Sequence, residues 1–496
     1  MSGTVATAAP DVVVIGSGVA GLCAAIEAAT RGARVLVCEG APAVGGASVM
    51  SGAGCCLVGT PLQESLGVQD SVELALSDLV SFGGPTADEQ WARAYLAASR
   101  SEVHDWCESL GIRWTSLVLQ EGNSVARWHG PQGWGRAIVA ALLSRCDELG
   151  VEIAVDSPVT DIEVESGAVR TVTVDTGGSV RVLRVNAVVV CSGGFVANHE
   201  MVLGTATGLR SVDRLLCGGS PLAVGAGHAL LQRVGAEFVN LDHIWVYPNG
   251  TPDPQDPLGL RGLGVRGVTG DIWLNQEGRR FHDETRRGGH SGTSALLKQP
   301  GQTAWCVFTA AEFDDVLLID NEYYATPAGS NPVAMQEFWR ESPFAWRADT
   351  PGALAAAIGL PAEAVQQSIE QVDACIAKGL AVEGAFGRDL RDVRPFMGPG
   401  LVALQFFPMA QKNFGGVHTD IACRVLRAEG DPIHGLYAAG EVAGMAGGAL
   451  NGRAALEGTM FGPCLYSGRV AGATAGAGLS APGQPAPGLQ ASAARH

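Results

Sequence analysis

Residues 11–39 carry the pattern that most constrains how this chain can fold. Asp11–Ile15 is a β-branched run typical of a buried strand, Val19–Arg31 is an alanine-rich helical segment, and Ala33–Glu39 is a second strand. The first strand and the helix are joined by a G-x-G-x-x-G turn. The pattern therefore predicts a βαβ unit of about 30 residues, the start of an α/β fold with a parallel sheet.

The glycine turn has the spacing of a dinucleotide-binding site. The first glycine permits the tight turn, the second lets the backbone approach a pyrophosphate, and the third lets helix and strand pack closely. The helix N-terminus offers N–H groups and its positive dipole end to phosphate. The acid that ends the second strand is placed to accept from a ribose hydroxyl and disfavours a 2′-phosphate, which leaves FAD or NAD. The residues predicted to contact the dinucleotide here are Gly16, Gly18, Val19, Ala20, Gly21 and Glu39.

Composition excludes several other classes of protein. The 496 residues are 47% hydrophobic, so the chain is folded and long enough for two to four domains. With 33 Lys+Arg against 50 Asp+Glu, its net charge of −17 argues against nucleic acid or anionic membrane as the main partner. The 68 glycines are about twice the usual share and have no collagen period, so we expect them in turns and close backbone approaches.

The twelve cysteines form no C-x-x-C pair, and Cys55 and Cys56 are adjacent. This spacing suits neither a disulfide framework nor a zinc site, so we expect reduced thiols and no metal. Neither a signal-peptide pattern nor an uninterrupted apolar stretch of about 18 residues is visible. The sequence thus predicts a soluble, cytoplasmic protein.

Hydrophobic periodicity places the remaining elements. Helical patterns are found at Ser71–Phe82, Asp88–Leu110, Trp134–Leu149, Pro351–Gly359 and Ala362–Lys378, with a last helix after Ala454. Between Val151 and Cys191 the period is two, which predicts a β-meander that closes on a strand at Ala187–Cys191. Residues after about Leu241 read as an irregular segment, and glycine-rich, strand-like sequence resumes near Leu401.

This change of character predicts a core domain interrupted by an insertion. We expect a nucleotide-binding domain in two parts, 10–240 and 401–472, around an inserted domain at 241–400. Residues 1–9 and 473–496 are poor in large apolar side chains and are predicted to be flexible ends.

Three further segments make the chain resemble the superfamily of FAD-dependent fumarate reductases and 3-ketosteroid dehydrogenases, to which the succinate dehydrogenase flavoproteins are similar. Gly45–Ser48 matches its G-G-x-[ST] segment and is followed by Ser51–Gly54, Cys191–Phe195 looks like its A-T-G-G-F turn, and Gly435–Glu441 is similar to its G-L-Y-A-A-G-E segment. The resemblance covers nearly the whole ordered chain and implies FAD, with Glu441 accepting from the ribityl chain. The further FAD contacts that it implies are Gly40, Gly45, Gly46, Ala47, Ser48, Ser51, Gly52, Ala53, Ser192, Gly193, Gly194, Gly440 and Glu441.

The fold implied is a Rossmann-like FAD-binding domain of the glutathione-reductase type, interrupted by an inserted α+β cap, with the active site between them. Val49–Gly59 lacks the histidine that carries covalent flavin in membrane-bound members, so FAD is expected to be non-covalent. No second G-x-G-x-x-G is present, so the external electron donor or acceptor stays unknown. Cys55 and Cys56 are expected to be packing residues.

The resemblance also implies candidates for proton transfer. In soluble fumarate reductases a cap arginine that follows R-F-x-x-E delivers the proton, and Arg280–Arg287 matches with a spacing one residue shorter. Arg287 is the first candidate and Arg286 the second. Because an arginine has a pKa above 12, it needs a carboxylate relay, for which Glu284 or Asp283 is expected.

Departures from the fumarate reductases concern the substrate side. Tyr247 precedes Pro248 where the family has a substrate-binding histidine, and Gln411 stands near a second family histidine, before the G-G-V segment. Losing both histidines makes fumarate an unfavourable substrate. Tyr247 instead favours the ketosteroid dehydrogenases, which use tyrosines to polarise a ketone and abstract a proton. Arg453 is the candidate for gripping a substrate oxygen.

The predicted substrate is larger than fumarate and contains a carbonyl. Aromatic and polar residues near the motifs would suit it, although core packing explains any single aromatic equally well. Trp128 and His129 are expected in a polar-aromatic loop, where His129 binds substrate or caps the helix near Trp134. The substrate-binding candidates are Trp128, His129, Trp245, Lys412 and Phe414.

These residues predict an FAD-dependent oxidoreductase that oxidises or reduces a C–C bond beside a carbonyl or carboxyl group, with Tyr247 or Arg287 handling the proton. Two alternatives remain from the sequence. One is a flavin oxidase or monooxygenase of a biosynthetic pathway, and the other is a protein that keeps FAD without turnover.

Overall fold

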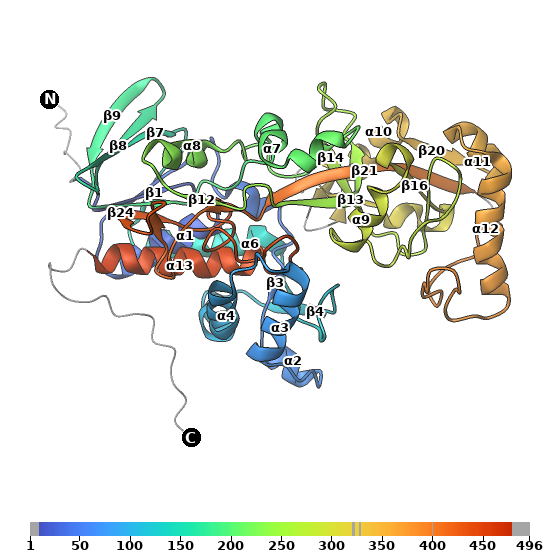
Figure 1. The fold of residues 1–496 in the computed structure, drawn as a ribbon, viewed down its shortest axis with the longest axis horizontal. Helices are drawn as coiled ribbons and strands as arrows, with labels where there is room; N and C mark the ends of the chain where they lie inside the picture. The colour runs from blue at the N-terminus through green and yellow to red at the C-terminus, as the bar shows by residue number, and fades with distance from the viewer. Residues whose placement is uncertain (1–8, 320–322, 327–328, 399, 479–496) are drawn as a thin grey trace. The chain divides into compact units, whose positions relative to one another are not determined.

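The computed structural model describes residues 9–319, 323–326, 329–398 and 400–478 (Figure 1). The chain divides into two compact units. The first unit comprises Met1–Thr205, Ser220–Ile244 and Lys412–His496, and the second comprises Ala206–Gly219 and Trp245–Gln411. The second unit therefore differs from the predicted insertion 241–400, because it includes an earlier segment and continues to Gln411.

The first unit is built on a largely parallel sheet with the strand order β6-β2-β1-β10-β24-β8-β7. Its parallel core strands are β1 (Val12–Ile15), β2 (Val35–Cys38), β6 (Glu152–Ala154), β10 (Ala187–Val190) and β24 (Pro432–Ala438). β8 (Ala168–Thr176) pairs in parallel with β24, and antiparallel strands extend the sheet further, namely β7 (Val159–Glu165) and β9 (Ser179–Arg184) beside β8, and β23 (Arg424–Leu426) beside β24. The predicted βαβ unit and β-meander are confirmed.

Alternate residues of β1 enter different cores on the two faces of this sheet. Val12 and Val14 pack on the side of α1, whereas Val13 and Ile15 pack with residues of the meander. Because every β1 residue is buried, the strand reads as a continuous apolar run rather than an alternating one.

Helices α1 (Val19–Thr30) and α13 (Phe461–Ala477) lie side by side (Figure 1). A Cβ on Gly468 would lie 2.3 Å from the carbonyl oxygen of Ala20, and one on Gly472 would lie 2.1 Å from that of Ala24. These glycines therefore serve close backbone approach, as expected from the glycine excess. α13 runs four residues past the predicted start of the flexible tail, and residues 1–8 and 479–496 lie outside the described residues.

The other helices of the first unit include those predicted at 71–82, 88–110 and 134–149, the second with one interruption, and three that were not predicted. They are α2 (Pro61–Ser65), α3 (Val72–Gly83), α4 (Glu89–Ala98), α5 (Trp106–Ser109), α6 (Trp134–Glu148), α7 (His199–Thr205) and α8 (Ala226–Arg233). The predicted helix 88–110 is broken by a π-helical turn, η2 (Ser99–Asp105). In that turn the carbonyl of Glu102 accepts from Nη1 of Arg469 at 2.7 Å, and a side chain that inserts into the helical ladder widens it.

The second unit has a mostly antiparallel sheet with the order β15-β16-β21-β13-β14-β17. Its strands are β11 (Leu216–Cys217), β13 (Ile244–Pro252), β14 (Gly262–Arg266), β15 (Ile272–Leu274), β16 (Ala304–Thr309), β17 (Leu317–Ile319), β20 (Ala345–Ala348) and β21 (Leu401–Asn413). Its helices are α9 (Ser291–Leu296), α10 (Pro332–Glu341), α11 (Pro351–Ile358) and α12 (Ala362–Ala377). The expectation of an irregular segment after Leu241 was wrong, because β13, β14 and β15 lie there.

No helix within the described ranges has the length and apolar character needed to cross a lipid bilayer. All twelve cysteines lie among the described residues and are free thiols.

Candidate functional site

The segments predicted to bind FAD follow four neighbouring strands of the first sheet. In register, Ile15 pairs with both Cys38 and Val190, and Val190 pairs with Ala438. Because these strands are parallel, the residues after them meet at one carboxyl edge of the sheet. Those residues are Gly16–Gly21 after β1, Glu39 after β2, Ser192–Gly194 after β10 and Gly440–Glu441 after β24. Ligands of open α/β sheets bind at this edge.

The three glycines of the turn serve different purposes. Gly16 has φ +100°, and its Cβ would lie 2.5 Å from the oxygen of Cys191, while a Cβ on Gly21 would lie 1.9 Å from the oxygen of Gly16. Gly18 has an ordinary φ of −65°, and its Cβ would meet nothing closer than Ser48 Oγ at 3.5 Å. The chain itself therefore requires glycine at positions 16 and 21, and the space beside Gly18 is left for a ligand.

Glu39 lies beside this turn and is fixed by it. One carboxylate oxygen accepts from Ser17 N at 2.9 Å and from Ser17 Oγ at 2.6 Å, and the other accepts from Ala41 N at 2.9 Å. The side chain is buried at the end of β2. A carboxylate can accept further hydrogen bonds, so this orientation suits a ribose hydroxyl.

The G-G-x-S segment lies across the N-terminus of α1. Gly45 has φ +105° and its N–H donates to Ser17 Oγ at 2.9 Å, and Ser48 Oγ accepts from Val19 N at 3.0 Å. The 3-10 turn η1 (Gly46–Met50) contains Ala47, and Ser51 Oγ then accepts from Ala53 N. Two glycine-rich segments thus converge on the helix end that favours phosphate.

A second group of FAD candidates surrounds Glu441. A Cβ on Gly194 would lie 2.3 Å from Glu441 Oε1, which accepts from Asn413 N at 3.2 Å. Burial raises the pKa of Glu441 to about 7, against the opposing charge of Lys412. Ser192 Oγ is buried and has no hydrogen-bond partner among the described residues. An orphaned hydroxyl and a carboxylate of raised pKa at a glycine-lined edge fit a bound cofactor.

These residues therefore fit FAD. Of the remaining candidates, Gly40 follows Glu39 directly, Gly52 stands between Ser51 and Ala53, Gly193 has φ +72°, and Gly440 N donates to Ser467 Oγ at 3.1 Å. Sequence reasoning missed Asn413, whose amide also bonds the carbonyls of Gly415 and Glu441. Its place just before the F-G-G-V segment was the available signal.

In the second unit, all three nitrogens of Arg287 donate hydrogen bonds. Nε donates to the carbonyl of Glu284 at 3.1 Å, Nη1 to the carbonyl of Val268 at 2.9 Å, and Nη2 to Asp271 Oδ1 at 2.7 Å. Burial disfavours the charged guanidinium, but the Asp271 carboxylate outweighs burial and raises the pKa of Arg287 above its ordinary value. Arg287 is therefore held as a cation.

The carboxylate that pairs with Arg287 is Asp271, whereas Glu284 or Asp283 was expected. The fully buried Glu284 side chain accepts from Arg280 at 2.7 and 2.6 Å and from Arg388 at 3.1 Å, and Asp283 accepts locally from Thr285. Asp271 also accepts from Trp273 Nε1 and Cys306 Sγ. The sequence feature that could have pointed to Asp271 is its position as a single acidic residue directly before the apolar strand β15.

Arg286 lies on the exposed side of the same segment, where Nη2 reaches Ser291 Oγ at 3.3 Å and its carbonyl accepts from His282. Tyr247 and Trp245 lie on β13 and are buried, with their rings 5.9 Å apart and edge to face. A Cβ on Gly289 would lie 2.4 Å from the Trp245 ring, so glycine at that position admits the indole.

The first unit holds the other substrate-side candidates. Trp128 and His129 belong to a strand, β5 (Trp128–Pro131), which pairs with β3 (Cys55–Cys56) and β4 (Trp114–Val118), so the predicted loop was wrong. His129 is fully buried between Thr60 Oγ1 and the carbonyl of Arg127, both at 2.7 Å, and burial lowers its pKa to about 4. It does not cap α6, whose N-cap is Gly133.

Phe414 is fully buried, and its N–H donates to the carbonyl of His243 at 2.7 Å. Lys412 lies at the end of β21, close enough to act on the charge of Glu441. Arg453 is exposed and pairs with Asp242 at 2.8 Å. In the first unit Arg453 is thus exposed to solvent, while the side chains of Phe414 and His129 are fully buried.

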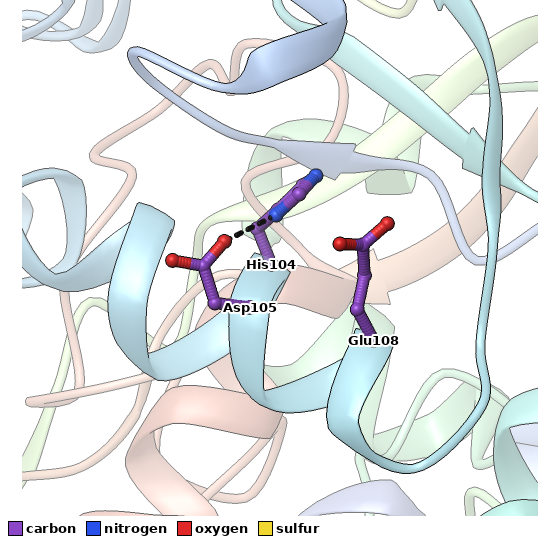
Figure 2. A group of neighbouring side chains, drawn as sticks. All are labelled: His104, Asp105 and Glu108. Atoms are coloured by element: carbon purple, nitrogen blue, oxygen red, sulfur yellow. Dashed lines mark hydrogen bonds and ion pairs between the residues drawn. The ribbon is translucent and has the colours of Figure 1, made fainter.

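Figure 2 shows the group of potential metal ligands found among the described residues, His104, Asp105 and Glu108. The buried His104 Nδ1 is 2.7 Å from Asp105 Oδ1, and Asp105 also pairs with Arg100 at 3.5 Å. Contacts within the chain account for this arrangement.

The glycine turns lie at the carboxyl edge of a parallel sheet, and the residues around them fit FAD. These two features define a dinucleotide-binding α/β protein. The chain belongs to the FAD binding domain family, whose model matches residues 11–459. A KsdD-like steroid dehydrogenase of Mycobacterium tuberculosis is 32% identical over 93% of this chain and 95% of its own length.

Two solved structures are similar to the whole chain. One is an open conformation of a flavocytochrome c3 fumarate reductase, with 26% identity, a TM-score of 0.75, and coverage of 95% of this chain and 79% of that one. The other is 3-ketosteroid-Δ4-(5α)-dehydrogenase of Rhodococcus jostii with 4-androstene-3,17-dione, with 26% identity, a TM-score of 0.70, and coverage of 96% and 99%. The predicted superfamily and the mixed α/β fold are confirmed. The chain is an FAD-dependent oxidoreductase that acts on CH–CH groups.

Proposed function

We propose that this flavoprotein desaturates a ring ketone of steroid type at the C–C bond beside the carbonyl, with Tyr247 as the group that takes the proton. The observation that carries the choice is the state of Arg287. Its three nitrogens are engaged and Asp271 raises its pKa, so it parts with a proton less readily than a free arginine. Tyr247 stands where a dicarboxylate-binding histidine was expected.

FAD, when bound, supplies the hydride acceptor at flavin N5. The dinucleotide part of FAD would be held by Gly16–Gly21, Ser48 and Glu39. The flavin side would be held by Glu441 and Asn413. Tyr247 removes the proton from the carbon next to the carbonyl, which builds negative charge on the carbonyl oxygen. Arg453 and Lys412 are proposed to bind an oxygen of the substrate.

The proposal gives each of the two units its own role. The first unit is the FAD-binding domain, and the second unit, which contains residues 245–400 of the predicted insertion 241–400, is the substrate-capping domain. The external electron acceptor is not assigned.

A cytoplasmic location is also proposed, supported by twelve free thiols. Since the relatives are dehydrogenases and reductases, the oxidase, monooxygenase and non-catalytic alternatives are not favoured.

Fumarate should be a very poor substrate. The two expected histidines would each donate a charge-assisted hydrogen bond worth about 1.5–3 kcal/mol. Their absence should therefore lower fumarate turnover by about 10² or more relative to an enzyme that has them. The measurement mixes dye-reduced holoenzyme anaerobically with fumarate, and separately mixes oxidised holoenzyme with 4-androstene-3,17-dione while following flavin absorbance. Robust reoxidation by fumarate, with no bleaching by the ketone, would contradict the proposal.

The flavin should be FAD and should not be covalently attached. No histidine is present in Val49–Gly59, so we expect acid precipitation to release all flavin into the supernatant. Chromatography of the supernatant identifies it as FAD or FMN. Yellow colour that stays in the washed precipitate would show a covalent link.

A further inference from the structure

Unlike Arg280, Arg287 and Arg388, Arg266 has no acidic partner among the described residues. Arg280 and Arg388 pair with Glu284, and Arg287 pairs with Asp271. Among the described residues, Arg266 makes one protein hydrogen bond, from Nη1 to the carbonyl of Val265 at 3.2 Å, and no ion pair. It is half-buried at the end of β14. An unpaired, half-buried cation is notable in a chain of net charge −17.

The guanidinium of Arg266 lies over the ring of Tyr247. Its Cζ is 5.3 Å from the ring centroid, and Tyr247 itself is buried. The two residues come from adjacent antiparallel strands, β14 and β13, whose register is fixed by the pair Gly250–Gly264. Trp245, packed edge to face on Tyr247, borders the phenol on its own strand. The sheet therefore holds cation and phenol together.

The charged groups on the other elements packed against β13 do not cancel this cation. Helix α9 packs on β13, where Thr293 Oγ1 donates to the carbonyl of Val246, and the segment before α9 packs there through Gly289 against Trp245. That segment carries Arg286, Arg287 and His290. Asp271 is already paired with Arg287. The neighbouring strand β21 has no charged residue between Leu401 and Gln411.

A cation over an aromatic face attracts a neutral phenol weakly, and it attracts the phenolate much more strongly because the ring then carries a full negative charge. We infer that Arg266 is a positioning residue that stabilises the tyrosinate form of Tyr247 and so prepares it to take a proton from a carbon beside a ketone. This inference rests on the proposed function for its purpose, but the ionisation of Tyr247 can be measured without any substrate.

The test compares the oxidised holoenzyme with Arg266→Gln, Arg266→Lys and Tyr247→Phe. Ultraviolet difference titration follows tyrosinate formation, and the signal missing in Tyr247→Phe belongs to Tyr247. An opposite charge at this range shifts a pKa by about 1–3 units. Arg266→Gln should therefore move the Tyr247 titration up by about one unit or more. Arg266→Lys, which keeps the charge, should move it less.

Arg279→Gln is the matched control, since this exposed arginine follows β15, which two strands separate from β13 in the sheet, and its replacement removes the same charge. It should leave the Tyr247 titration unchanged. With 4-androstene-3,17-dione as probe, the rising limb of the pH–rate profile should follow the same order of variants. An unshifted titration in Arg266→Gln, in a protein that melts like the wild type, would overturn the inference. A shifted titration without ketone turnover would uphold it and refute the proposed function instead.

Discussion

Replacing Gly18 by valine should weaken FAD binding strongly while leaving the chain folded. A Cβ at this position meets only Ser48 Oγ at 3.5 Å, and its φ of −65° suits any residue. The side chain would instead occupy the space where the backbone approaches the pyrophosphate. Such overpacking costs about 1–3 kcal/mol or more, so FAD affinity should fall by at least about ten- to a hundredfold.

The measurement is the flavin-to-protein absorbance ratio of the purified variant, together with its circular dichroism and melting temperature. Gly204→Val is the matched control, because a Cβ at Gly204, on α7 of the same unit, meets nothing within 4 Å. It should keep both fold and FAD. A Gly18→Val protein that binds FAD normally would show that the dinucleotide does not approach this turn.

Gly21→Val provides the opposite contrast. Its Cβ would lie 1.9 Å from the carbonyl oxygen of Gly16, which is backbone and cannot move aside without shifting β1 or α1. We therefore expect this variant to lose the fold along with the flavin. The two glycines look equivalent in the G-x-G-x-x-G pattern, and the structure separates the one that serves the chain from the one that serves the ligand.

Local patterns predicted the first unit well because its elements are determined by neighbours in the sequence. The run Val12–Ile15 is buried on both faces, and the alternation from Val159 to Arg184 produces a meander with short turns. The FAD-site segments were located by the G-x-G-x-x-G pattern and by the resemblance to family motifs, and those after β1, β2, β10 and β24 lie at one edge of the same sheet. The strand and turn patterns need no knowledge of distant contacts.

The second unit was harder because its contacts join distant parts of the chain. In the sheet β13 lies between β14, which follows it closely in the chain, and β21, which comes about 150 residues later. Its Pro248, Asn249 and Gly250 break the usual strand pattern. The partner of Arg287 was misassigned for the same reason. Glu284 is three residues away in the sequence, but Arg280 and Arg388 already occupy it, and Asp271 reaches Arg287 through the fold.

Removing the Tyr247 hydroxyl should have the largest effect on catalysis. Tyr247→Phe keeps the buried ring, its edge-to-face packing on Trp245 and the Arg266 guanidinium over its face, but it removes the proton that the phenol can exchange. A positioned general acid or base contributes about 10²–10⁴ to the rate. Turnover of 4-androstene-3,17-dione should fall by that factor, with FAD content and melting temperature unchanged.

Arg287→Lys tests the rival assignment on the same substrate. A lysine keeps the positive charge beside Asp271 but loses the planar fork that reaches Val268 and Glu284, so some loss of stability is expected. If Tyr247 exchanges the proton, the flavin-reduction step measured by rapid mixing should slow far more in Tyr247→Phe than in Arg287→Lys. The reverse order would transfer the proton-exchanging role to Arg287 and favour a reductase. Near-normal rates in both would mean that neither residue lies at the reacting carbon, and that the active site is built from other residues of the chain.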